Sequence, residues 1–246
     1  MSEPGRNADW QSIQDRFYDE ADKHTHLAFD AASTYAKDLT DHLRHALQLT
    51  AGDRVLEVGA GAGRFTLHLA PYCRTVAALD TSPALLGALE QQSPPGSAVE
   101  PVCASVFDLP GPFGPASFDA VCGFFILHHL PDHEKLFGLI RGSLKPGGRV
   151  AFVEPNRLNP LFLVQVAVSR EMTWEAERGM FTFSASRTAQ VLRAAGFSGI
   201  RLLRFGLCPP QLLDRVPALL WLQRGLEKIP FVRRFLPFVL IVAEAS

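Results

Sequence analysis

Residues 54–66 constrain the fold of this chain more than any other stretch. The run 55–58, Val-Leu-Glu-Val, has the apolar composition of a strand that is buried on both faces. It is followed by three alternating glycines: Gly59, Gly61 and Gly63. These glycines let the backbone turn tightly into a helix, which we expect to begin near Arg64. Because glycine leaves the backbone open to a ligand and a helix start offers N–H groups, we predict a polar ligand on this loop.

The spacing of the glycines separates two classes of ligand. A dinucleotide fingerprint requires G-x-G-x-x-G, but counting from either Gly59 or Gly61 leads to a last position that is not glycine. The pattern is instead Glu57-x-Gly59-x-Gly61-x-Gly63, which resembles motif I of the class I S-adenosylmethionine-dependent methyltransferases. The resemblance implies S-adenosyl-L-methionine as the cofactor, with Glu57 and the three glycines at its methionyl end.

Two later segments resemble the parts of this family that hold the nucleoside. Asp80 ends a second apolar strand, where its carboxylate is placed to accept hydrogen bonds from both ribose hydroxyls, and Thr81 follows it. A plain helix-capping role for Asp80 remains the alternative. Ser105 and Val106 occupy the segment that cups the adenine in the family. Ser105 stands where aspartate is usual, and a hydroxyl accepts a hydrogen bond more weakly than a carboxylate; Val106 would lie on the adenine face.

The segment 118–130 resembles a further family motif, Phe-Asp-x-Val followed by Leu-His-His-Leu. The resemblance implies that the backbone at Gly123 and Phe124, at the end of a fourth strand, faces the methionyl part of the cofactor. For the two histidines of this motif, local packing is the favoured interpretation. No cysteine or carboxylate cluster supports a metal site, so we predict none.

Four residues are candidates for a general base: His128, His129, Glu154 and His26. Glu154 follows the fifth predicted strand, and the carboxyl ends of parallel strands share one edge of a sheet. Glu154 and Asn156 therefore lie where an acceptor could be touched, although the prolines around them also fit a plain connecting loop.

Strands and helices alternate as far as residue 153, which predicts an α/β fold with a doubly wound, mostly parallel, Rossmann-like sheet. By resemblance the sheet has seven strands, the last inserted antiparallel between the fifth and sixth. We expect an N-terminal helical cap segment at 1–50 and a methyltransferase domain at 51–246, with helical lid insertions at about 157–185 and 207–235. Tyr18 or the Phe29 to Tyr35 segment resembles the part that closes over the cofactor in relatives, and packing of these aromatics on the core remains an alternative.

Composition sets limits on location and partners. The net charge of −1 gives no attraction to nucleic acid, so no nucleic-acid partner is expected. Four scattered cysteines fit buried free thiols in a reducing compartment. The polar N-terminus is not a signal peptide and no uncharged run could span a bilayer, so we predict a cytoplasmic location. The sequence leaves the oligomeric state open.

Together these features predict methyl transfer to a small molecule with a sizeable apolar part, since both insertions are rich in Leu, Phe and Trp. Two alternatives remain: a non-catalytic S-adenosylmethionine-binding regulatory subunit and an NAD-dependent oxidoreductase, which the glycine spacing disfavours. In the second insertion, Leu219, Leu222, Leu226 and Ile229 form an apolar stripe on a helix. We favour packing of that stripe on the protein's own sheet over a weak peripheral membrane contact.

Overall fold

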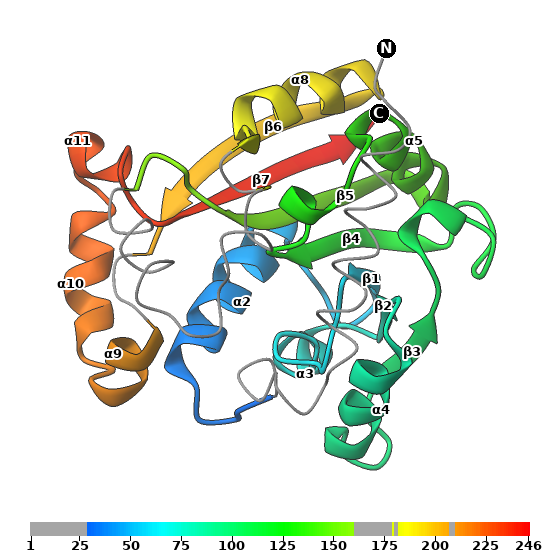
Figure 1. The fold of residues 1–246 in the computed structure, drawn as a ribbon, viewed down its shortest axis with the longest axis horizontal. Coiled ribbons are helices and arrows are strands. Elements are labelled where there is room, and N and C mark those ends of the chain that lie inside the picture. The colour runs from blue at the N-terminus through cyan, green and yellow to red at the C-terminus, as the bar shows by residue number, and fades with distance from the viewer. Residues whose placement is uncertain (1–28, 160–178, 180–181, 207–209) are drawn as a thin grey trace.

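The computed structural model describes residues 29–159, 179, 182–206 and 210–246. A single sheet of seven strands, in the order β3-β2-β1-β4-β5-β7-β6, forms its centre (Figure 1). The first five strands in this order are parallel, and β7 pairs antiparallel with both β5 and β6. The predicted α/β fold, including the inserted antiparallel strand, is confirmed.

The strands are β1 Arg54–Val58, β2 Thr75–Asp80, β3 Val99–Cys103, β4 Phe118–Phe124, β5 Leu144–Pro155, β6 Phe197–Phe205 and β7 Phe238–Ala245. The α-helices are α2 Thr34–Leu47, α3 Thr66–Leu69, α4 Pro83–Gln92, α5 His133–Ser143, α8 Ala185–Ala194, α9 Pro210–Arg215, α10 Leu219–Leu226 and α11 Pro230–Arg233. Short 3-10 helices are η3 Ala70–Tyr72, η4 Val106–Asp108 and η5 Leu127–His129.

Helices cover both faces of the sheet, as strands that are apolar on both sides require. On one face Phe137 of α5 and Leu192 of α8 pack against Phe152 of β5. On the other, Leu39 of α2 and Leu69 of α3 pack against the opposite sides of the same strands. Figure 1 shows α5 and α8 above the sheet and α2 and α3 below it. Each fully buried side chain of this size stabilises the fold by about 1.5–3 kcal/mol.

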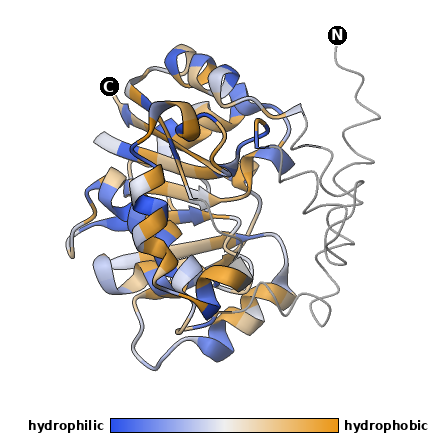
Figure 2. Cartoon of the chain, turned by 90° about the vertical axis from the view of Figure 1, so that its left-hand side faces the viewer, coloured by the Kyte–Doolittle hydropathy of each residue, from blue (hydrophilic) through white to orange (hydrophobic). Residues whose placement is uncertain are grey.

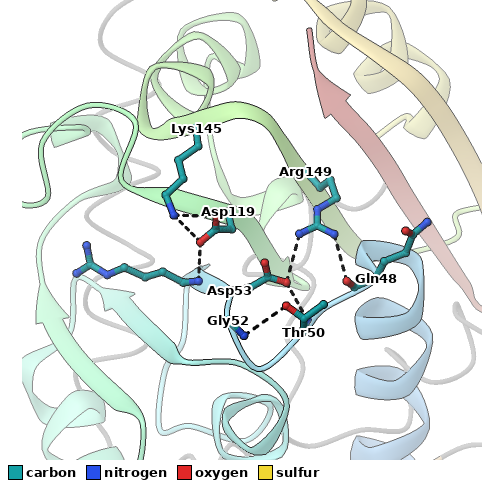
Figure 3. A network of polar contacts seen from close by, with 8 residues as sticks. Gln48, Thr50, Gly52, Asp53, Asp119, Lys145 and Arg149 are labelled. Carbon is teal, nitrogen blue, oxygen red and sulfur yellow. Dashed lines mark hydrogen bonds and ion pairs between the residues drawn. The ribbon is translucent and has the colours of Figure 1, made fainter.

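A polar network ties together the amino ends of β1, β4 and β5 (Figure 3). The Asp119 carboxylate accepts hydrogen bonds from the Arg54 N–H at 2.8 Å and from Lys145 Nζ at 2.7 and 2.8 Å. Arg149 donates to Asp53 at 3.3 Å and to the Gln48 carbonyl at 3.1 Å. This network lies at the edge opposite the carboxyl ends of the strands, and it fixes the turn by which α2 enters β1.

Local expectations were wrong at two places. The helix after the glycine loop begins at Thr66, two residues later than predicted, and its neighbour Phe65 caps it without a side-chain hydrogen bond. Among the cysteines, Cys103 is exposed.

The division into a cap segment and a methyltransferase domain stays a prediction. Residues 1–28, and with them Tyr18 and His26, lie outside the described residues, as does most of the insertion at 157–185. In the insertion at 207–235 the structure places α9, α10 and α11. Among the described residues, no helix has the length and apolarity needed to cross a membrane.

Candidate active site

The glycine loop leaves the carboxyl end of β1 with all three glycines at positive φ: 72° at Gly59, 53° at Gly61 and 86° at Gly63. A Cβ at Gly59 would lie 2.7 Å from Ile126, and one at Gly63 would collide with Leu89. A Cβ at Gly61 would meet only Leu85, at 3.9 Å. Packing therefore requires two of the glycines, whereas Gly61 faces open space, as a ligand-facing position should.

Glu57 lies beneath this loop and is 1% exposed. Its Oε2 has no hydrogen-bond partner among the described residues. Burial raises the pKa of Glu57 to about 8; the nearby Thr66 hydroxyl opposes the increase and the Asp80 charge adds to it. A buried carboxylate oxygen without a donor is costly, and a bound group that carries positive charge or N–H donors would relieve that cost.

We expect the variant Glu57→Gln to be more stable than the natural protein in a pH-dependent way. Since the carboxyl of folded Glu57 titrates near pH 8 and that of the unfolded chain near 4.5, the folded state holds one more proton between these values. The free energy of unfolding therefore falls by ~1.4 kcal/mol per pH unit across this window, and glutamine removes that loss. Thermal unfolding curves of both proteins from pH 5 to about 9 measure the difference; a constant gap in Tm would contradict the prediction.

Asp80 ends β2 beside the glycine loop and is half-buried. Its Oδ2 accepts from the Gly61 N–H at 2.8 Å and its Oδ1 from the Ser82 N–H at 2.9 Å. Burial raises the pKa of Asp80, while the N–H groups of Ser82, Gly61 and Thr81 oppose the increase. A carboxylate has about four lone-pair sites, so these bonds leave capacity for two hydroxyl donors. The structure thus joins Asp80 to the glycine loop, and its contact with a ribose stays a prediction.

We expect Asp80→Ala to weaken binding of S-adenosylmethionine at least tenfold, because hydrogen bonds to a charged group contribute roughly 1.5–3 kcal/mol each. Asp80→Asn keeps an acceptor oxygen for a loop N–H, so its affinity for S-adenosylmethionine should lie between those of the natural protein and Asp80→Ala. Calorimetric titration measures the affinities, and the Tm of each variant shows whether the fold is kept. Unchanged affinity in a folded Asp80→Ala protein would remove this residue from the site.

Ser105 and Val106 follow β3 on the same edge. The Ser105 hydroxyl accepts from the Phe107 N–H at 3.2 Å, and the Asp108 carboxylate accepts from the Ser105 N–H at 3.2 Å, which closes a capping box around η4. Val106 is buried and belongs to the hydrophobic core. Both residues therefore have structural roles in this segment, and their contacts with an adenine ring stay predictions. Thr81 is exposed beside them.

Gly123 and Phe124 lie at the end of β4. A Cβ at Gly123 would come within 2.7 Å of Ile126 and 3.0 Å of Phe152, so packing explains the glycine. The Phe124 ring stacks on Phe65, with the ring centroids 4.1 Å apart. Ile126 was missed by sequence reasoning: it fills the space left by both Gly59 and Gly123 and so couples the glycine loop to β4. One glycine directly after β1 and another in the neighbouring strand β4 were the available signal that a larger side chain fills the space between them.

The structure brings two of the candidate bases together. Nδ1 of His128 lies 2.6 Å from Oε2 of Glu154, and both side chains are buried. The other oxygen of Glu154 accepts from the N–H groups of Ile126 at 3.0 Å and Leu127 at 2.7 Å. Because a carboxylate accepts, the proton belongs on Nδ1 of His128, and Nε2 then carries the lone pair. Glu154 is thus placed to orient His128.

The remaining candidate bases differ from this pair. The His129 ring lies 3.9 Å from that of His128, measured between centroids. Burial, together with the neighbouring His128, holds the pKa of His129 well below its ordinary range, so it is neutral near pH 7.

The backbone of Gly179, from the first insertion, packs against the His128 carbonyl so closely that a Cβ there would overlap it. Among the described residues, no group of three or more His, Cys, Asp or Glu could hold a metal ion.

The segment from Phe29 to Tyr35 docks beside the glycine loop. The Phe29 N–H donates to the Gln92 side chain at 3.1 Å, and its ring packs on His68 of α3 at 4.8 Å between centroids. The guanidinium of Arg64, in the glycine loop, lies 5.2 Å from the centre of the Tyr35 ring. Of the two N-terminal candidates, this one has its described residues next to the loop; Tyr18 lies outside the described residues.

These features fit the cofactor that the sequence predicts. S-adenosylmethionine carries an ammonium and a sulfonium, both positive, which suit the buried and partnerless Oε2 of Glu57. Its ribose hydroxyls suit the remaining lone pairs of Asp80. The open position at Gly61 lets the backbone approach a ligand. We therefore assign the methionyl end to Glu57 and Gly61 and the ribose to Asp80 as a working hypothesis.

Comparison with known proteins points the same way. The family model described as "Methyltransferase domain" matches residues 56–152. An uncharacterized methyltransferase of Synechocystis sp. is 31% identical over 159 residues, which cover 63% of this chain and 71% of that protein. A ubiquinone biosynthesis O-methyltransferase of Xanthomonas euvesicatoria is 34% identical over 117 residues, 47% of this chain and 48% of that enzyme.

A solved structure shows the same fold. It is that of a Haemonchus contortus phosphoethanolamine N-methyltransferase in complex with S-adenosyl-L-methionine, with a TM-score of 0.59 and 20% identity. The match covers 85% of this chain and 52% of that protein. The chain therefore spans about half the length of this protein and of the Xanthomonas enzyme.

Proposed function

This chain belongs to the class I S-adenosylmethionine-dependent methyltransferases, and we propose that it methylates a hydroxyl group on a small molecule with a sizeable apolar part. Family membership favours methyl transfer over both a regulatory subunit and an NAD-dependent oxidoreductase. The finer part of the proposal, the acceptor, depends on one observation: the buried pair of His128 and Glu154.

We propose that the acceptor binds beside this pair. Glu154 is near the carboxyl end of β5 and His128 follows the carboxyl end of β4, on the edge that also carries the glycine loop. Ile126 connects the glycine loop to Glu154. Its side chain fills the space above Gly59, and its N–H donates to the Glu154 carboxylate. Ligands of doubly wound sheets bind at this edge.

When bound, S-adenosylmethionine supplies a methyl group that is already activated by a positively charged sulfur. The protein then has to orient the acceptor, exclude water and remove one proton. In our proposal Nε2 of His128 takes the proton of the acceptor hydroxyl. Glu154 holds the imidazole through Nδ1 and stabilises the positive charge that the ring gains, as the carboxylate does in other His–carboxylate pairs. Glu154 is therefore a positioning residue in this scheme.

The apolar part of the acceptor is supported by the sequence of the first insertion and by the relatives. Residues 161–183 include Phe162, Trp174 and Phe181, where a polar acceptor would be met by hydrogen-bonding groups. One relative is named for ubiquinone biosynthesis and another, from Clavibacter sepedonicus, as a demethylmenaquinone methyltransferase. A phenol that carries an apolar chain is thus the first acceptor class to test.

The test uses S-adenosylmethionine labelled in the methyl group. The purified chain is incubated with a phenol that bears an alkyl chain and, as the matched control, with the same phenol without the chain. We expect the phenol with the alkyl chain to be labelled, and we expect kcat/KM to be much lower for the phenol without the chain. If calorimetry shows bound cofactor and neither phenol nor a panel of related hydroxyl compounds is labelled, the proposed acceptor class is wrong.

A further inference from the structure

Helices α10 and α11 form the edge of the molecule seen at the left of Figure 1 and faced directly in Figure 2. In Figure 2 hydrophobic and hydrophilic residues alternate along this edge. Trp221 is 81% exposed and Phe231 is 77% exposed, the two highest values among the exposed large hydrophobic residues of the described chain. Leu222, Ile229 and Phe235 are also exposed. We call these five residues the apolar patch.

Helix α10 packs on the protein through polar contacts of Gln223 and Glu227 and, at its start, through Leu219 and Leu220, which lie against the core. Gln223 is 1% exposed, and its Nε2 donates to the Asp38 carboxylate of α2 at 2.7 Å. Glu227, one turn on, accepts from the Gly206 N–H at 2.8 Å and lies 3.8 Å from His42. The preference for packing of the apolar stripe on the sheet is therefore wrong for two of its members, because Leu222 and Ile229 face outward.

The charge around the apolar patch is positive. Residues 212–235 contain five basic residues, Arg215, Arg224, Lys228, Arg233 and Arg234, and all five are exposed. The same range contains two acidic residues, and both have their carboxylates engaged by the body of the protein. Asp214 accepts from the Tyr35 N–H at 2.9 Å, and Glu227 makes the contacts described above. The outward face thus combines large apolar side chains with uncompensated cations.

This surface adjoins the candidate active site. The side chain of Asn156, two residues after Glu154, donates to the carbonyls of Arg234 at 3.0 Å and Leu236 at 2.7 Å. The Asn156 N–H donates to the Pro237 carbonyl at 2.7 Å. The exit of α11 is therefore fixed to the same edge of the sheet as the His128 and Glu154 pair. Asn156, which the sequence placed near the acceptor, acts here as that anchor.

We propose that α10 and α11 are a docking surface for an anionic lipid bilayer. Trp221 and Phe231 would enter the boundary between headgroups and acyl chains, while the arginines and Lys228 contact the lipid phosphates. A second copy of the chain fits less well, because a symmetric contact would place like charges opposite one another. Docking at this edge would bring the active site to a bilayer in which an apolar acceptor dissolves; the docking itself does not depend on the proposed reaction.

Co-sedimentation of the full chain with vesicles tests the proposal at low salt. We expect binding to phosphatidylcholine vesicles that contain phosphatidylglycerol and little binding to phosphatidylcholine alone. The double variants Trp221→Ala with Phe231→Ala, and Arg233→Ala with Arg234→Ala, should each weaken binding about tenfold or more. Arg187→Ala with Arg193→Ala removes the same charge from exposed positions of α8 and should bind like the natural protein.

Three results would overturn the proposal. The first is no binding of the natural protein to anionic vesicles at low salt. The second is equal loss of binding in the α8 control, which would mean that net charge rather than this surface matters. The third is a dimer, seen by sedimentation velocity, that Trp221→Ala with Phe231→Ala dissociates, which would assign the surface to a second copy. None of these measurements needs an acceptor, so they are separate from the test of methyl transfer.

Discussion

Replacing Gly61 with valine is expected to abolish measurable binding of S-adenosylmethionine while the chain remains folded. The Cβ position at Gly61 has 3.9 Å of clearance from its nearest neighbour, Leu85, so the substitution does not disrupt the protein's own packing. The new side chain would instead occupy the space above the loop. We expect the affinity to fall by about 100-fold or more, which corresponds to at least ~2.7 kcal/mol.

The backbone at Gly61 has a φ of +53°, so any side chain there also causes strain. Gly96 is the matched control, because it has a φ of +77° and no atom within 4 Å of its Cβ position, in a turn after α4. Gly96→Val should lower the Tm by an amount similar to Gly61→Val, since both place a branched side chain at positive φ. It should leave the affinity unchanged. Calorimetric titration measures the affinity of both variants for S-adenosylmethionine. A folded Gly61→Val protein with normal affinity would place the cofactor elsewhere.

The other two glycines cannot serve for this test. At Gly59 a Cβ would lie 2.7 Å from Ile126, and at Gly63 it would collide with Leu89. Substitutions there would disturb the loop before any ligand was present. The three glycines look alike in the sequence, and only the positions of Ile126 and Leu89 separate the open one from the packed ones.

The sheet could be predicted because its signals are local. Buried strands such as β1 and β4 are short apolar runs, and alternation with helices implies parallel pairing. Asp80 could be found for the same reason, since its place at a strand end is read from the chain itself. Contacts between distant segments left no such signal. The sequence offered His128 and Glu154 as separate candidates, and the 2.6 Å contact between them is a product of the fold.

Helix α10 shows most clearly where sequence reasoning ends. The sequence correctly predicted an amphipathic helix here, but periodicity does not say which side of the helix packs on the protein. A buried glutamine is unfavourable unless it is hydrogen-bonded, and the partner that Gln223 finds, Asp38, is 185 positions earlier in the chain. That single pairing turns Trp221 outward. The usual assumption that an apolar stripe meets a core holds for Leu219 and fails for Leu222 and Ile229, on a helix whose buried side also carries the Gln223 contact.

The His128 and Glu154 pair gives the second large expected effect, on the rate of transfer. His128→Ala should lower kcat by about 10²–10⁴-fold with the phenol acceptor, the usual contribution of a general base. The affinity for S-adenosylmethionine should stay within about twofold of normal, because the glycine loop and Asp80 are untouched. His45→Ala, which removes an exposed imidazole from α2, is the control and should leave kcat unchanged.

Glu154→Gln separates orientation from proton transfer. An amide can still meet Nδ1 of His128, but it does not supply the negative charge that stabilises a protonated ring. It also puts one acceptor and one donor where the carboxylate now accepts from two N–H groups and His128. We expect kcat to fall by roughly tenfold or more. The acidic limb of the pH dependence of kcat should shift to lower pH, because a protonated imidazole without the neighbouring carboxylate is less stable and loses its proton at lower pH.

A purely structural role would have a different signature. If His128 and Glu154 only pack the end of β4, their variants should lower the Tm while kcat per folded molecule and its pH profile stay as in the natural protein. Single-turnover rates at saturating cofactor, measured across pH for both variants and for His45→Ala, distinguish the cases. A His128→Ala protein that transfers methyl groups at the natural rate would show that His128 is not the general base of the reaction.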